Sequence, residues 1–91
     1  MATISPSTAR AAIAARVRLW RLTVLRGSVE IAARECGVSA AVLEAIEGGV
    51  GGVTLDDYLK VVARIGSLEG VVQSTVPDHA LLESMSAIAA G

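Results

Sequence analysis

The stretch Gly27–Gly49, GSVEIAARECGVSAAVLEAIEGG, holds two short helix patterns separated by a glycine. Ser28 can cap a first helix that ends near position 35, and Ser39 can cap a second that runs to about position 47. Gly37 allows a tight reversal between them, because glycine accepts backbone angles that other residues avoid. The stretch predicts a helix-turn-helix whose inward residues are Ile31, Ala32, Ala33, Val38, Leu43 and Ile46.

A long helix is expected before this unit, from Pro6 to about Arg26. Proline at the first helical position loses no needed hydrogen bond, and Gly27 is expected to end the helix as a left-handed cap. Residues spaced three and four apart predict a core stripe of Ile13, Val17, Trp20 and Val24. A second apolar stripe on the opposite side needs a cover, and consists of Ala12, Ala15, Leu19 and Leu22.

Two further helices and an extended segment are expected after it. GGVGG at 48–52 is interpreted as a connector rather than a phosphate cradle, since neither a strand nor a lysine accompanies it. Thr54 and Asp57 form a capping box for a helix to Gly66, with Leu55, Leu59, Val62 and Ile65 inward. Residues 68–76 are rich in β-branched side chains and predict a strand. Pro77 begins an amphipathic helix.

The pattern resembles the helix-turn-helix of the Cro and lambda-repressor-like (Xre) family. The segments VRLWR (17–21) and TLDDYLKVVARIG (54–66) look like that family's first and fourth helices, so the resemblance covers about residues 16–66. It implies an all-α domain of four to five helices, here with a short extended segment and a C-terminal amphipathic helix. The order of segments is also similar to antitoxins of the HipB and HigA kind, which implies autoregulation. The residues that carry the resemblance are Ser28, Ala33, Gly37, Val38, Ser39, Leu43, Ile46, Glu47 and Gly49.

The length of 91 residues allows a single domain. We expect a flexible N-terminus over residues 1–5, the helix-turn-helix domain over 6–70, and a strand and helix tail over 71–91 for docking or dimerisation. Apolar side chains left without a cover predict a homodimer. The residues expected at a dimer or partner interface are Leu19, Leu22, Val71, Val72, Leu81, Leu82, Met85 and Ile88.

Basic residues gather in the first third of a chain whose net charge is −1. Arg10, Arg16, Arg18, Arg21, Arg26 and Arg34 precede position 35, against one acid, Glu30. This asymmetry gives either a positive pole for phosphate or an acidic partner, or a set of solvated helix faces. On a helical wheel three of the arginines form a stripe that could contact DNA phosphates, namely Arg10, Arg18 and Arg21.

The resemblance implies that the helix over residues 39–47 would enter the major groove of double-stranded DNA. Its outward residues are unusual, because alanine and glutamate cannot form bidentate contacts to guanine or adenine, and Val29 cannot either. Glu44 and Glu47 would also place negative charge near phosphates. Alanine could still touch a thymine methyl, and glutamate could accept from cytosine. The candidate DNA-contacting residues of the two helices are Ser28, Ser39, Ala40, Ala41, Glu44 and Ala45.

Two functions follow from these observations. One is a DNA-binding transcriptional regulator, a repressor. The other is a helix-turn-helix that has lost its reading residues and instead binds a protein, inhibiting a transcription factor or a toxin. The resemblance to the fold family favours the first, and the chemistry of residues 40–45 favours the second.

Enzymatic, metal and membrane functions are not expected. His79 is the only histidine and has no cysteine near it in sequence, and the adjacent Asp56 and Asp57 are explained by favourable charge in a helix's first turn. Cys36 is the only cysteine, so it cannot form an internal disulfide and is expected to be a small buried residue. No apolar run reaches the roughly 18 residues that span a bilayer, and no secretory signal begins the chain. We therefore expect a cytoplasmic protein without a cofactor.

Overall fold

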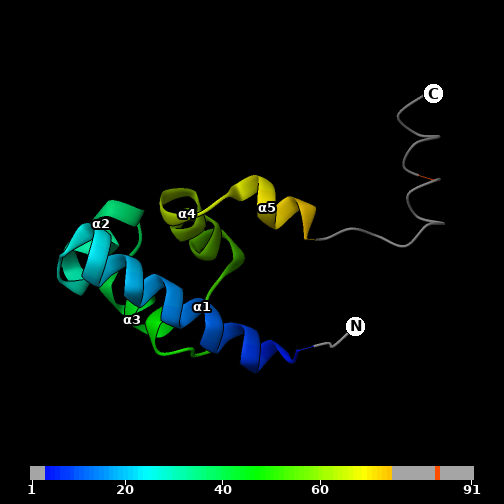
Figure 1. The fold of residues 1–91 in the computed structure, drawn as a ribbon, viewed down its shortest axis with the longest axis horizontal. Helices are drawn as coiled ribbons and strands as arrows, with labels where there is room; N and C mark the ends of the chain where they lie inside the picture. Colours follow the sequence, from blue (N-terminus) through cyan, green and yellow to red (C-terminus); the bar gives the residue numbers. More distant parts are fainter. Residues whose placement is uncertain (1–3, 75–83, 85–91) are drawn as a thin grey trace.

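The computed structural model describes residues 4–74 and residue 84. These residues contain no strand, which confirms the all-α fold class. No helix among them is long and apolar enough to cross a bilayer. In chain order the elements are α1 (Pro6–Trp20), the π-helical turn η1 (Arg21–Leu25), α2 (Val29–Cys36), α3 (Ala40–Glu47), α4 (Leu55–Ile65) and α5 (Leu68–Gln73) (Figure 1).

Hydroxyl side chains begin the helices as the sequence predicts. Ser28 accepts a hydrogen bond from the Ile31 backbone N–H at 3.2 Å, which starts α2. Thr54 accepts one from the Asp57 N–H at 3.1 Å, which starts α4. Each bond satisfies a backbone donor that has no partner within its own helix, and so fixes where that helix begins.

The end of the first long helix differs from the prediction. Arg26, and not Gly27, adopts the left-handed backbone conformation, with φ 56°. The π-helical turn over η1 places more residues in one turn than an α-helix does, so side chains after Trp20 point in new directions. Val24, predicted to be in the core, is therefore 71% exposed, and Leu25 packs against the core in its place.

The predicted strand over 68–76 is also wrong where the structure describes it, because residues 68–73 form α5. The Ser67 hydroxyl accepts from the Gly70 N–H at 3.0 Å and caps this helix. The cap outweighs the strand preference of Val71 and Val72, since that preference depends strongly on neighbouring strands. The other predicted interface residues of the tail lie outside the described residues: Leu81, Leu82, Met85 and Ile88.

The core lies where α1, α2, α3 and α4 meet. Ile13, Trp20 and Leu25 pack against it from the side of α1 and η1. Besides Val24, two predicted core residues, Ile31 and Leu55, are exposed. Ile31 lies outside the face by which the short helix α2 packs, and Leu55 sits at the first turn of α4 next to the glycine loop. The fully buried cluster comprises Val17, Ala32, Ala33, Cys36, Leu43, Ile46 and Val61.

Candidate functional site

The helix-turn-helix unit is formed by α2, the turn at Gly37 and α3. Gly37 has φ 75°, in the left-handed region that favours glycine, and the Val38 N–H donates to the Ala33 carbonyl at 3.0 Å. Ala33 is buried and small, so the two helices approach each other closely. The Ser39 hydroxyl accepts from the Val42 N–H at 3.1 Å and starts α3. The local signals in the sequence therefore correspond to the observed turn.

The outer face of α3 carries small side chains. Ala41 and Glu44 are exposed, and Ala40 and Ala45 are half-buried. The hydroxyls of Ser28 and Ser39, which are further candidate contacts, cap their helices. Apart from the two capping serines, Glu44 is thus the one candidate on this face whose side chain carries a polar group. Beside the face lies a shallow hollow of about 290 Å³, lined by Ala41, Val42, Ala45, Gly51, Gly52, Val53, Thr54 and Asp57.

A buried carboxylate joins the end of α3 to the first long helix. Glu47 is 6% exposed, and its two carboxylate oxygens accept from Nε and Nη2 of Arg21 at 2.7 and 2.8 Å. Arg18 donates through Nη2 to the Glu47 backbone carbonyl. The hydrogen bond to Glu47 raises the pKa of Arg21. The expectation that Glu47 would repel phosphates is therefore wrong, because its charge is buried and neutralised.

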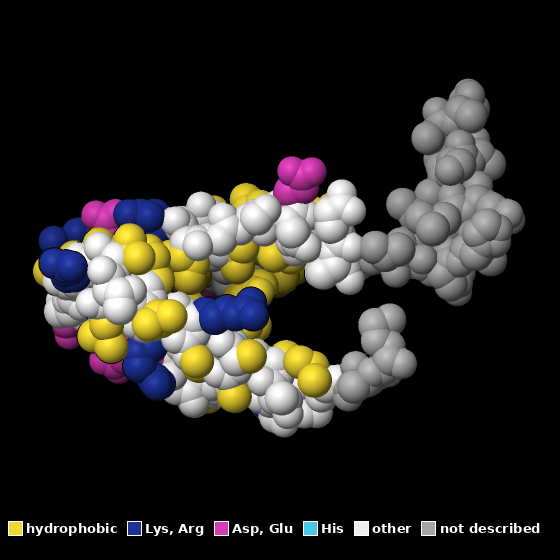
Figure 2. All heavy atoms as spheres, viewed as in Figure 1, with side chains coloured by type: hydrophobic (Ala, Val, Ile, Leu, Met, Phe, Trp, Pro, Cys, Tyr) yellow, Lys and Arg dark blue, Asp and Glu magenta, His cyan; other side chains and the backbone are white. Residues whose placement is uncertain are grey.

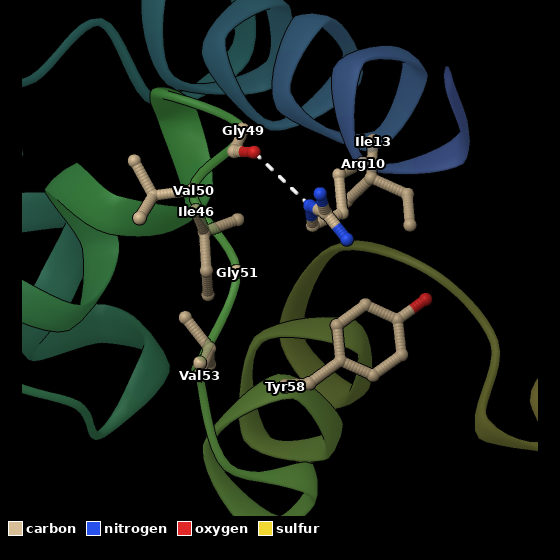
Figure 3. Close-up of a pocket in the computed structure, with 9 residues that line it drawn as sticks. Arg10, Ile13, Ile46, Gly49, Val50, Gly51, Val53 and Tyr58 are labelled. Atoms are coloured by element: carbon tan, nitrogen blue, oxygen red, sulfur yellow. Dashed lines mark hydrogen bonds between the residues drawn. The ribbon is translucent and has the colours of Figure 1, made fainter. Parts of the chain in front are cut away.

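Arg10, nearer the start of α1, contacts the chain just after α3. Its Nε donates to the Gly49 carbonyl at 3.2 Å (Figure 3). The three arginines predicted to contact phosphate, Arg10, Arg18 and Arg21, thus come together at the C-terminal end of α3, where the helix dipole favours positive charge. Arg21 is mostly buried and bound to Glu47, whereas Arg10 and Arg18 remain exposed and keep donors that face solvent.

A second polar link holds α4 to α1 and α2. The Arg64 guanidinium lies 5.3 Å from the centre of the Trp20 ring, and its Nε is 3.3 Å from Oε2 of Glu35. An ion pair as exposed as Arg64–Glu35 contributes little to the free energy of unfolding. The link therefore chiefly orients α4 relative to α1 and α2. Cys36 lies in the core beneath it, and burial raises the pKa of its thiol.

The sequence did not reveal the Arg21–Glu47 pair. A signal was present, since Glu47 falls on the same side of its helix as Leu43 and Ile46, but an acid at a helix end is usually solvated. Within residues 4–74 and 84, no group of His, Cys, Asp or Glu is placed to hold a metal ion. Comparison with protein-family models, curated proteins and solved structures gave no match.

Proposed function

We propose that this protein is a helix-turn-helix transcriptional regulator, a cytoplasmic repressor that binds double-stranded DNA as a homodimer through α3. The observation that carries the proposal is the α2–Gly37–α3 unit, in which α3 keeps one face open to solvent. Arg18 and Arg21 hold α3 to α1 through Glu47. A reading helix needs this kind of fixed attachment, because its position in the groove depends on the rest of the domain.

The chemistry of α3 implies low sequence specificity. Ala41 and Ala45 would bring the helix close to base edges and to thymine methyls, but they cannot form the hydrogen bonds that distinguish guanine and adenine. Affinity would then come mostly from the DNA backbone, through the exposed Arg10 and Arg18 and the amides at the starts of α2 and α3. Such binding should weaken steeply as salt increases.

The exposed side of α1 and η1 suggests how two copies would pair. Ala12, Ala15 and Leu19 are exposed in α1, and Leu22 is exposed at the start of η1, with Leu19 and Leu22 61% and 56% exposed. If two such helices pair antiparallel, Leu22 of one copy lies over Ala12 of the other, and Leu19 over Ala15. Large side chains then meet small ones, and two-fold symmetry repeats each contact with the two copies exchanged.

The test is a titration of the protein against its own upstream DNA and against scrambled DNA, at low and at physiological salt. Ala41→Glu adds a negative charge to the exposed face of α3, so it should abolish DNA binding. Ala63→Glu, the same change at an exposed position of α4, should not. Arg18→Ala should weaken both DNAs alike, because a phosphate contact carries no sequence information. The repressor proposal is wrong if the protein binds neither DNA even at low salt.

The second candidate, a protein-binding module, is favoured by a specific observation. The hollow beside α3 is lined by alanine, valine and glycine, contains no cation, and is bordered by Asp57. That surface suits an apolar segment of a transcription factor or a toxin better than it suits phosphates. Under this alternative a complex with such a partner would also be lost on Ala41→Glu, but it would change little with salt, whereas a DNA complex should weaken steeply as salt increases.

A further inference from the structure

An apolar groove runs between α1 and α4. Its deeper part has a volume of about 290 Å³ and lies between the partly exposed Trp20 on one side and Val62 and Ile65 on the other, above the buried Val17 and Val61. Ile13, Ile46 and Tyr58 also border a second hollow of about 200 Å³ toward the glycine loop (Figure 3). These shared residues make the two hollows continuous. Figure 2 shows hydrophobic side chains facing the open space between α1 and the α4–α5 arm.

We propose that residues 77–91 of the same chain occupy this groove as an amphipathic helix. The sequence places Leu81, Leu82, Met85 and Ile88 along one side of that helix, which matches the apolar lining. The inference goes beyond the proposed function and does not depend on DNA. It concerns the face of α1 opposite Ala12, Ala15 and Leu19, the face proposed to pair in the dimer.

Charge complementarity favours this segment as the occupant. Arg10 borders the hollow at the glycine loop, and Arg16 borders the deeper part. Arg16 forms no ion pair with any residue that the structure describes. Residues 75–91 contain Asp78 and Glu83 but no lysine or arginine, and Asp78 lies on the apolar side of the helical wheel. Because Asp78 would be the first residue of the tail helix, at the Trp20 end of the groove, docking would bring it toward Arg16.

The length of the chain also suits the groove. α5 leaves on the open side of the molecule, toward which the N-terminal half of α1 extends (Figure 1). At about 1.5 Å per residue, α5 carries the chain about 9 Å from α4. Residues 75–77 can span up to about 10 Å and so return it. A helix over 78–91 would be about 21 Å long, enough to lie along the groove from Trp20 toward Arg10.

Trp20 offers a direct readout, since it is the only tryptophan and it lines the groove. In the unsubstituted protein we expect Trp20 to be shielded from acrylamide quenching. Met85→Asp places a charge on the apolar side of the tail, and should increase quenching and shift the emission to longer wavelength. Ala87→Asp adds the same charge to the opposite side, and should leave both unchanged. Equal quenching in the three proteins would overturn the proposal.

A charge exchange separates docking from a general loss of stability. Arg16→Glu alters an exposed side chain, so the domain should stay folded while Trp20 becomes more accessible. Asp78→Arg in the same chain should restore the shielding, which a merely unfolded tail would not do. Dilution distinguishes a tail helix of the same chain from one of a second copy. If the tail is from the same chain, Trp20 must stay shielded at concentrations where light scattering shows a monomer. Shielding that disappears with the dimer would assign the groove to a second copy instead.

Discussion

Glu47 is an acid buried at the end of a surface helix, and two arginines from another helix make that burial possible. Its carboxylate would be unstable in the core without Arg21, which donates two hydrogen bonds in a planar, bidentate arrangement. Arg18 adds a bond to the Glu47 carbonyl, which has no partner within α3. The pair therefore fixes the orientation of α3 from its C-terminal end.

Arg21→Ala should consequently destabilise the fold more than Arg18→Ala. Removing Arg21 leaves a buried carboxylate without its partner, which costs about 2–4 kcal/mol in the free energy of unfolding. Arg18 is half exposed, so its loss should cost less than about 1 kcal/mol. Urea denaturation followed by circular dichroism measures both. Similar midpoints for the two variants would mean that the Arg21–Glu47 bond contributes little to the attachment of α3.

Among the elements, η1 determines how α1 leads into the helix-turn-helix. The π-helical turn rotates Val24 outward and Leu25 inward, and it ends at Arg26 in a left-handed conformation. That conformation costs a non-glycine residue roughly 1 kcal/mol, because Cβ approaches the following carbonyl oxygen. Arg26 is followed by a glycine that does not take the strained position.

Arg26→Gly should therefore stabilise the protein by roughly 0.5–1 kcal/mol, raising its melting temperature. Arg26→Ala is the matched control, since it removes the same side chain but keeps the Cβ that causes the strain, and it should give no gain. A calorimetric scan of the two variants gives the comparison. If alanine stabilises as much as glycine, the cost at position 26 comes from the arginine side chain and not from the backbone.

The sequence predicted those features that depend on a few neighbouring residues. Ser28, Ser39 and Thr54 were identified as caps because a cap and its helix lie together in the chain, and Gly37 was identified as the turn for the same reason. The burial of Glu47 could not be predicted, because Arg21 lies 26 positions away and is brought near only by the packing of α1 on α3. The shift from Val24 to Leu25 also escaped prediction, since a regular helical period cannot anticipate a π-helical turn.

At the scale of the whole molecule, α1 presents apolar side chains on two sides. One side lines the groove toward α4, and the other carries the exposed stripe of Ala12, Ala15, Leu19 and Leu22. A dimer built on the outer stripe leaves the groove and the outer face of α3 available. The proposed regulator would need its two copies of α3 to lie about one turn of the DNA duplex apart, as in paired helix-turn-helix domains.

Leu19→Asp should dissociate this dimer, because it places a charge at the centre of the antiparallel pairing without a partner. Leu55→Asp, the same change at an exposed leucine on α4, should leave it intact. Light scattering across a concentration series measures the dissociation of both variants. A dimer that survives Leu19→Asp must use a surface other than α1.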